Sequence, residues 1–330
     1  EGCTIGSWAD GGGESGAAED LGYIYDSNTK TYTVYNANGL MNIAELVNGG
    51  KTDINITLDT NIDLTGKDWT PIGTSFRNSY TGTFDGGGHT IKGLTVTTND
   101  QFVGLFGSLG EAGTVKNVVM EGVQITNNQI NGGSIGGVVG FSWGGTIENC
   151  SVSGSVSGTV YVGGVVGAQW DGSITGCSSS ATVKGMVDVG GVVGQTNGNT
   201  TMTACYATGD VTLEIDPKKN ISGGSLVGFN GGSSVRACYA TGNVTSTGSS
   251  TGKVHIGGLF GDNYTDLTAC YWKNNHEQGI GYNNKSTKVT KVDGTDVTWQ
   301  KAVDAMNTAL QNAGSKWRYE LNGTLPTLKK

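Results

Sequence analysis

The stretch Gly136-Gly137-Val138-Val139-Gly140 decides the fold, because close copies of it recur along the chain. The copies are Gly163-Gly164-Val165-Val166-Gly167, Gly190-Gly191-Val192-Val193-Gly194 and Gly257-Gly258-Leu259-Phe260-Gly261, with the variants Val103-Gly104-Leu105-Phe106-Gly107 and Gly223-Gly224-Ser225-Leu226-Val227-Gly228. Their closing glycines are 27 to 34 residues apart. Self-similarity at such a period is typical of a repeat architecture, in which each unit packs only on its neighbours.

Other residues recur in phase with this glycine motif. A cysteine follows each of the last five motifs after nine to eleven residues, an aliphatic residue precedes each cysteine by three, and a valine follows most cysteines by six. The cysteines are Cys150, Cys177, Cys205, Cys238 and Cys270. Aligning residues 146–150 with 114–118, and then with 90–94, extends these columns towards the N-terminus.

The repeat predicts an all-β fold, a single-stranded parallel β-helix. Short segments of alternating apolar and Ser or Thr residues, bounded by glycine, are typical of strands. The period is too short for a propeller blade and lacks the helices of ankyrin or TPR repeats. Parallel coils about 4.8 Å apart then stack equivalent residues into ladders.

The position just before the cysteine column predicts a bend. The aliphatic and cysteine columns are three residues apart, so a straight strand would point them to opposite faces. Since both columns are apolar, we expect a left-handed residue between them. The residues there are Gly93, Asn117, Asn149, Gly176, Ala204, Ala237 and Ala269. We expect the stacked cysteines to be reduced, buried thiols, because successive ladder positions point the same way and give poor disulfide geometry.

Helices are predicted outside the repeats. Leu40, Ile43, Ala44 and Val47 have helical spacing before Gly49, and apolar residues with the same spacing run from Trp299 to Leu310 after a possible N-cap at Thr298. We expect each helix to cap one end of the stack, which would otherwise expose unpaired strand edges. The predicted organisation is an N-terminal segment and cap over 1–50, a β-helix over 51–275 and a C-terminal cap over 276–330, with a helix at 299–312 and a terminal strand.

Three of the repeats are longer than the others. Their extra residues are 127–132, 214–220 and 246–253, each just before a glycine motif. Stacking predicts that the three insertions lie along one edge of the rod. Two interpretations remain: this edge is the binding side of the solenoid, or it only tolerates loops.

Composition excludes several classes of protein. The 58 glycines among 330 residues are more than twice the usual share, but with 3 prolines the chain is not collagen. The net charge of −8 disfavours nucleic acid as a partner, since phosphate recognition needs clustered Lys and Arg. The apolar runs are a few residues long, so no membrane span is expected.

The glycine motif, followed about ten residues later by Asn or Ala, Cys, and Tyr or Ser, resembles the GLUG motif of bacterial secreted and surface proteins. The run from Ile62 to Leu94 is similar to the segment that precedes such repeats, and Leu325-Pro326-Thr327-Leu328 to the end of gut Bacteroidetes members. The resemblance implies a right-handed β-helix and an adhesin-like protein, extracellular or on the outer surface of a bacterial cell. Cys3 lies outside the cysteine ladder, and three alternatives remain for it: a free thiol, a disulfide with an unidentified partner, or a lipid anchor, although Glu1 and Gly2 precede it.

Catalytic and metal chemistry find little support in the sequence. The GLUG motif also occurs in proteins described as IgA peptidases, but a zinc protease needs two histidines one turn apart, and His276-Glu277 lacks the second. Asp63, Asp68 and Asp85 can meet on neighbouring early coils or simply cap turns. No acidic column appears. We therefore expect no catalytic residue, no metal, no cofactor, and a protein that is not an enzyme.

Aromatic columns give the binding hypothesis. Tyr206, Tyr239 and Tyr271 each follow a ladder cysteine and are expected to stack on the outer face, and Trp143 and Trp170 occupy adjacent coils. Rows of exposed rings suit sugar faces or protein partners, although the same rings can instead shield the sheet. The expected function is non-catalytic adhesion by a monomer to a host surface protein or glycan. The alternative is a carbohydrate-active enzyme or glycan-binding module.

Overall fold

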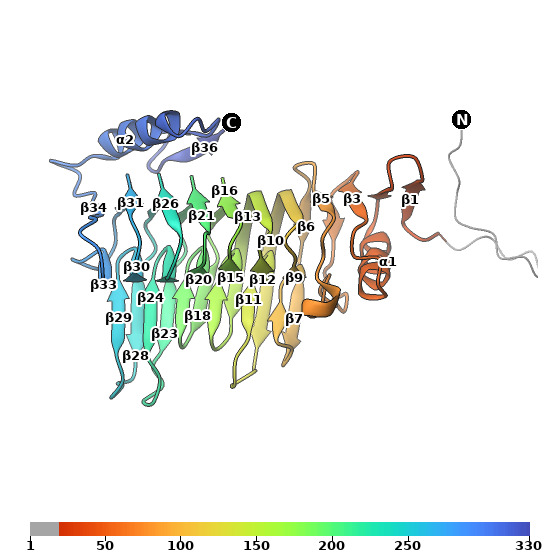
Figure 1. Ribbon diagram of the computed structural model, residues 1–330, viewed down its shortest axis with the longest axis horizontal. Helices are drawn as coiled ribbons and strands as arrows, with labels where there is room; N and C mark the ends of the chain where they lie inside the picture. Colours follow the sequence, from red (N-terminus) through yellow and green to blue (C-terminus); the bar gives the residue numbers. More distant parts are fainter. Residues whose placement is uncertain (1–19) are drawn as a thin grey trace, which may run out of the picture.

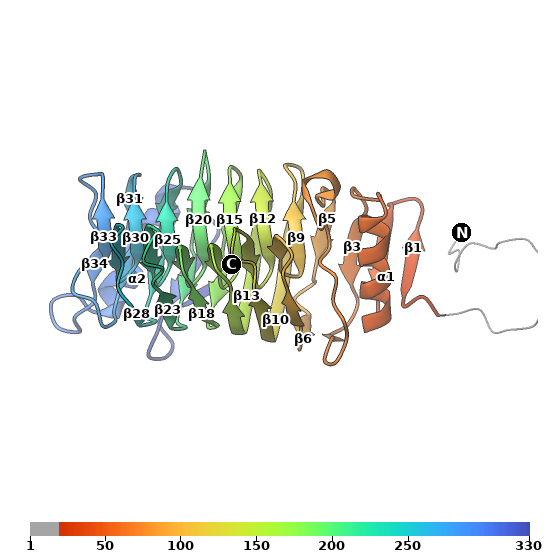
Figure 2. The same ribbon diagram turned by 90° about the horizontal axis from the view of Figure 1, so that it is seen from below.

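The computed structural model describes residues 20–330 and shows an elongated stack of parallel β-coils (Figure 1). The stack contains three parallel sheets, which we number 1 to 3, of 21, seven and six strands. Each repeat adds one rung to every sheet, as Figure 2 also shows. The predicted parallel β-solenoid is therefore confirmed. Cys3 lies outside the described residues.

Sheets 2 and 3 flank the glycine motifs, so that within each repeat a strand of sheet 3 leads through the motif into a strand of sheet 2. The strands of sheet 3 are β8 (Phe102–Val103), β11 (Ser134–Gly136), β14 (Tyr161–Gly163), β19 (Asp188–Gly190), β24 (Ile221–Gly224) and β29 (Val254–Gly257). Those of sheet 2 are β9 (Phe106–Leu109), β12 (Val139–Trp143), β15 (Val166–Trp170), β20 (Val193–Asn197), β25 (Val227–Asn230), β30 (Phe260–Asn263) and β33 (Ile280–Asn283).

Sheet 1 forms the rest of each coil. Its N-terminal strands are β1 (Tyr23–Asp26), β2 (Thr31–Val34), β3 (Asn55–Leu58), β4 (Ile62–Asp63), β5 (Thr83–Asp85), β6 (Thr90–Lys92) and β7 (Thr95–Thr98), of which β1 and β2 pair antiparallel. Two long strands follow, β10 (Thr114–Asn127) and β13 (Thr146–Ser157). Later coils divide this strand into β16 (Ser173–Thr175), β17 (Ser178–Ser179), β18 (Thr182–Gly185), β21 (Thr201–Thr203), β22 (Tyr206–Ala207), β23 (Val211–Glu214), β26 (Ser234–Arg236), β27 (Tyr239–Ala240), β28 (Val244–Thr247), β31 (Leu267–Thr268), β32 (Tyr271–Trp272) and β34 (Thr290–Lys291).

The predicted columns stack in register. Val115 pairs with Ile147, Ile147 with Ile174, and the column continues to Leu267. The five ladder cysteines are buried and free, as expected. Burial raises the pKa of the Cys150, Cys205 and Cys270 thiols, which keeps them protonated in the core.

The expected left-handed bend is present in every coil from Asn117 onward. All seven residues predicted for it have positive φ, including the alanines Ala204 at 53°, Ala237 at 54° and Ala269 at 51°. Alanine rarely adopts this conformation, which costs about 1–2 kcal/mol relative to the right-handed region. The bend turns the chain between two columns that both face the core.

The early coils have a different register from the one that the sequence suggests. Residues 114–116 pair with 83–85, and residues 90–92 lie beneath Val119 to Glu121. The expected alignment of 90–94 with 114–118 is therefore wrong. Two short strands separated by a turn, β5 and β6, both pair with the single long strand β10, and their alternating patterns are too similar to distinguish by sequence.

The two helices have different positions on the rod. Helix α1 (Ala37–Asn48) is capped by Asn36 and buries Leu40, Ile43 and Val47 at the N-terminal end of the core. Helix α2 (Trp299–Asn312) is capped by Thr298, as predicted, but lies along the side of the stack over sheet 1 (Figure 1). It packs there together with the antiparallel hairpin β35 (Arg318–Glu320) and β36 (Thr327–Lys329). The expected position of the second helix over the end of the rod is wrong.

Glycines bring sheets 2 and 3 into backbone contact. A Cβ atom built on Gly167 would overlap the Ile135 nitrogen and the Gly140 oxygen of the preceding coil, and the equivalent Gly194 would meet Val162 and Gly167 in the same way. Only glycine leaves room for this approach. The sheets therefore meet at a tight corner, whose shape is set by the missing side chains.

Substituting Gly167→Ala is expected to destabilise the fold by about 3 kcal/mol, because the backbone of a neighbouring coil has to move. Gly323→Ala is the matched control, since nothing lies within 4 Å of the added methyl group, and we expect a change within about 0.5 kcal/mol. Urea unfolding followed by circular dichroism measures both. Equal midpoints for the two variants would contradict the corner geometry.

Candidate functional site: a groove beside the glycine motifs

The glycine corner places residues seven apart in the sequence opposite each other. The Gln195 side-chain amide donates to the Asp188 carboxylate at 3.0 Å, and His255 Nδ1 lies 2.7 Å from Asp262 Oδ1. Asp188 and His255 belong to sheet 3, and their partners Gln195 and Asp262 belong to sheet 2. Stacking repeats this arrangement coil after coil, so that two facing columns of side chains line a groove along the rod.

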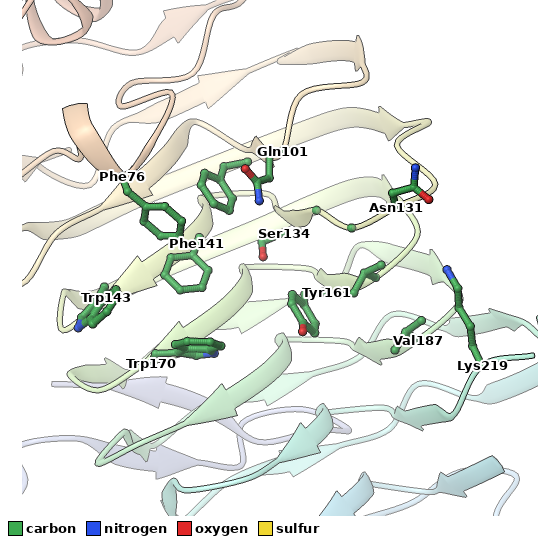
Figure 3. A pocket seen from close by; sticks show the side chains of 14 residues that line it. Phe76, Gln101, Asn131, Ser134, Phe141, Trp143, Tyr161, Trp170, Val187 and Lys219 are labelled. Atoms are coloured by element: carbon green, nitrogen blue, oxygen red, sulfur yellow. The ribbon is translucent and has the colours of Figure 1, made fainter. Parts of the chain in front are cut away.

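The N-terminal half of the groove is aromatic and has a volume of about 600 Å³. Figure 3 shows Phe76, Phe141, Trp143 and Trp170 grouped at one end of it. Phe76 packs edge-on against Phe141 at 5.1 Å, and the rings of Trp143 and Trp170 are 6.4 Å apart. Phe76 and Trp143 each keep 53 % of their surface exposed. These rings present an apolar face to any ligand in the groove.

Insertion loops border this aromatic half. Asn131 and Lys219 line it from the side opposite the tryptophans (Figure 3). The Lys219 ammonium group donates to the Ile130 carbonyl at 3.3 Å, and Ser250 Oγ donates to the Pro217 carbonyl. The three predicted insertions therefore lie along one edge of the rod, and each supplies a polar side chain to the groove: Asn131, Lys219 and Lys253.

The C-terminal half of the groove is polar and has a volume of about 250 Å³. Asp188, Ser222 and His255 are successive rungs of one ladder in sheet 3. Opposite them, Asp262 accepts hydrogen bonds from Ser222 and His255, while the His255 ring stacks on Tyr282 at 5.0 Å. Val187 lines both halves, so the two pockets adjoin along the rod.

Asp188 has an unusual protonation state. Its side chain is almost fully buried, with 7 % of the residue exposed. This burial, with a smaller contribution from the negative charge of Asp262, raises the pKa of Asp188 to about 7, although the hydrogen bond from Gln195 opposes the shift. A proton-donating carboxyl group therefore faces the groove near neutral pH.

The predicted binding residues divide between two places. Trp143 and Trp170 lie in the groove. The tyrosines Tyr206 and Tyr239 do stack, with ring centroids 4.9 Å apart and planes within 2°, but Tyr239 has no exposed surface. It packs against Trp299 of α2, and its hydroxyl donates to the Pro326 carbonyl.

The expected exposure of the tyrosine column is therefore wrong, because the C-terminal helix and hairpin cover it. Tyr206 and Tyr271 are partly buried in the same contact. A strand pattern shows which side chains leave the core, but it does not show what packs on them afterwards. The covered column belongs to the structural attachment of α2.

The early aspartates do not form a joint site among the described residues. The Thr65 hydroxyl and then the Thr65 backbone nitrogen lower the pKa of Asp63 by hydrogen bonding to its carboxylate. Asp85 accepts from the Gly87 nitrogen and the Asn117 amide. Both therefore cap turns. Residues 20–330 contain no group of three or more His, Cys, Asp or Glu side chains arranged for a metal ion.

Sequence reasoning missed Phe76, Asp188, His255 and Asp262. Asp188 and Asp262 never form one column because they belong to different sheets, Asp188 to β19 of sheet 3 and Asp262 to β30 of sheet 2. The available signal was the seven-residue spacing across the motif in Asp188–Gln195 and His255–Asp262. Phe76 comes from a short 3-10 helix, Phe76–Asn78, in an irregular early coil with no repeat to reveal it.

The fold is a parallel β-solenoid with a groove along its side. The sequence profile of the GLUG motif matches residues 131–157, 158–184 and 219–245, so these three repeats are GLUG repeats, as the sequence predicts. Neither helix of residues 20–330 has the length and apolarity to cross a bilayer.

Two known proteins are similar in sequence to parts of this chain. Halomucin of Haloquadratum walsbyi is 32 % identical over 150 residues, which is 42 % of this chain and 2 % of halomucin. A "Putative Gly-rich membrane protein" of Evansella cellulosilytica is 35 % identical over 100 residues, 29 % of this chain and 11 % of that protein. The chain thus spans a small fraction of the length of both proteins.

A solved structure corrects one expectation. The crystal structure of a "putative immunoglobulin A1 protease" from Bacteroides ovatus aligns with a TM-score of 0.67 at 18 % identity, covering 91 % of this chain and 92 % of that one. A neighbour named for proteolysis overturns the expectation that the protein is not an enzyme. At this identity the likeness shows the fold alone, so any reaction has to be argued from the groove.

Tyr239→Ala is expected to destabilise the protein by about 3–5 kcal/mol, because it removes a fully buried ring between sheet 1 and α2. Trp143→Ala, at a half-exposed ring, is expected to change stability by less than about 1 kcal/mol. The midpoints of thermal unfolding of the two variants, each compared with the wild type, measure these changes in stability. A small loss of stability in Tyr239→Ala would show that the tyrosine column does not stabilise the attachment of α2.

The raised pKa of Asp188 predicts a pH-dependent stability. The folded protein binds more protons than the unfolded chain between about pH 4 and pH 7, so the free energy of unfolding falls as pH rises through this window. Asp188→Asn should remove this fall, which is on the order of 1–4 kcal/mol. Urea unfolding at both ends of the window tests it, with the exposed Asp210→Asn as control. An unchanged pH slope in Asp188→Asn would contradict the burial argument.

Proposed function

We propose that the protein acts outside the cell or at its surface and binds an extended, neutral glycan along the groove. The observation that carries this proposal is the row of partly exposed rings, Phe76, Trp143 and Trp170, in an open cleft. Aromatic faces suit the C–H faces of sugar rings, and a small number of polar groups then fixes their orientation.

Polar side chains that can orient a sugar by hydrogen bonding surround the aromatic rings. Gln101 and Asn131 have amide side chains at the wall of the aromatic half, and Ser134 and Tyr161 have hydroxyl groups there. Amides and hydroxyls both donate and accept hydrogen bonds, as sugar hydroxyls require. The groove thus combines stacking surfaces with hydrogen-bonding groups of both kinds.

Charge favours a neutral ligand. The net charge of the chain is −8, and Asp188 and Asp262 lie in the same groove. Anionic sugars bound beside these carboxyl groups would be repelled whenever Asp188 is ionised. Two adjoining pockets that span several coils fit a chain of sugar units better than a compact ligand.

The relatives support a location at or outside the cell surface. Halomucin and the glycine-rich membrane protein carry names of surface or envelope proteins, and buried free cysteines in a core ladder are compatible with that setting because they are shielded from oxidants. An adhesin-like role, in which the groove attaches the cell to a host or matrix glycan, follows from this location.

A glycan array with neutral, sulfated and uronate-containing members tests the proposal. We expect neutral oligosaccharides to bind, and Trp143→Ala or Trp170→Ala to weaken their binding about 10-fold each, equal to about 1.4 kcal/mol. Tyr25→Ala, at a half-buried ring on the N-terminal hairpin, should bind like the wild type. Binding of no glycan, or wild-type binding by the double tryptophan variant, would falsify the proposal.

A further inference from the structure

The polar half of the groove contains two proton-transfer groups on one ladder. Asp188 and His255 are two rungs apart in sheet 3, with Ser222 on the rung between them. At about 4.8 Å per rung, their backbones are about 10 Å apart. Both side chains line the same pocket as Tyr282. A sugar unit entering this pocket from the aromatic half would lie between an acid and a base.

His255 is arranged as a base. Its Nδ1 atom is bonded to Asp262, which is 3 % exposed, so Nε2 is the nitrogen left to accept a proton. Stacking on Tyr282 fixes the plane of the ring. A buried carboxylate that orients an imidazole and stabilises its protonated form is the arrangement that makes histidine an effective general base.

Asp262 is a positioning residue. One of its oxygens accepts from His255 and the other from the Ser222 hydroxyl, so neither is free to attack a substrate. Ser222 is bonded to this carboxylate and has no bond to the histidine. The three residues therefore lack the hydroxyl-to-imidazole contact of a serine nucleophile.

Asp188 is arranged as an acid. Its Oδ2 atom accepts from Gln195, and burial keeps a proton on the carboxyl group up to about pH 7. Enzymes that transfer protons near neutral pH commonly raise a carboxyl pKa in this way. Four titratable groups lie near Asp188. They are Tyr161, whose pKa is raised by burial and by the negative charge of Asp188, and Lys253, Tyr264 and Tyr282, which line the pocket.

We propose that Asp188 and His255 hydrolyse a glycosidic bond of the glycan bound in the groove. This inference rests on the proposed function. Asp188 gives its proton to the glycosidic oxygen as the bond from that oxygen to the anomeric carbon breaks. His255 Nε2 takes a proton from a water molecule whose oxygen forms the new bond to the same carbon. One water is consumed, and solvent then returns a proton to Asp188 and removes one from His255.

The separation of the two groups specifies the stereochemistry. Inverting glycosidases keep their acid and base about 6.5–9.5 Å apart to leave room for the water, whereas retaining enzymes need about 5–5.5 Å. Two rungs of a β-ladder put the backbones of Asp188 and His255 about 10 Å apart, which is nearer to the inverting spacing than to the retaining one. The product is therefore expected to have the opposite anomeric configuration to the bond that is cleaved.

Oligosaccharides that bind on the glycan array are incubated with the full chain, and new reducing ends are measured with the product anomer by NMR. Asp188→Asn and His255→Gln are expected to slow cleavage at least about 100-fold, with the Kd for the same oligosaccharide unchanged within about 3-fold. Asp210→Asn, an exposed carboxylate of the same coil outside the groove, should cleave at the wild-type rate.

The pH profile separates the roles of the residues. Cleavage should fall as pH rises through about 7, because Asp188 loses the proton that it must donate. Asp262→Asn should lower the rate and change the acidic limb of the profile, which a merely structural role would not do. Circular dichroism of each variant confirms that it is folded.

The outcomes are distinct. If no glycan binds, the proposed function fails and this inference fails with it. If glycans bind but no reducing ends appear, only this inference is overturned. Retention of the anomeric configuration, or cleavage of immunoglobulin A1 or casein used as peptide probes in place of the glycan, also overturns it.

Discussion

Backbone contact at the glycine corner is the constraint on which the rest of the structure depends. Where sheet 3 turns into sheet 2, a Cβ atom at Gly167 or Gly194 would occupy the space of a neighbouring coil's backbone. Glycine costs conformational entropy on folding, and the ladder hydrogen bonds and buried apolar columns of every coil offset this cost. Because the corner is tight, side chains seven residues apart face each other outside it. One local constraint, repeated by stacking, thus produces both the rod and its groove.

A second constraint acts at the left-handed bend. The residue type at this position depends on whether another part of the chain packs over it. In the middle coils the position holds Asn149 and Asn117, whose side chains form an amide ladder that ends on Asp85. Under the C-terminal module it holds Ala204 and Ala237, which are buried against α2 and its hairpin. An asparagine there would bury an amide, whereas alanine accepts a strained φ and keeps the contact apolar. The C-terminal module has therefore shaped the sequence of the repeats beneath it.

The repeat itself could be predicted from the sequence, because stacking forces the same residue type into the same environment in every coil. This is why the aliphatic column, the buried cysteines and the bend at Ala237 agree with the structure. Three features could not be predicted. The register of β5 and β6 lies where the repeat is irregular, the cover over Tyr239 comes from residues about 60 to 90 positions away, and the pairing of His255 with Asp262 joins two different columns. Each of these depends on packing between segments that have no common pattern.

The proposed function and the proposed reaction divide one groove into an aromatic half, proposed to hold a glycan, and a polar half, proposed to cleave it. The two halves depend on the same corner but on different side chains, Trp143 and Trp170 in one and Asp188 and His255 in the other. The most direct measurement is a crystal structure of the protein with an array-selected oligosaccharide. The account predicts sugar rings in the groove, stacked on the tryptophans and extending to Asp188. Sugar bound on another face, with the groove empty, would contradict it.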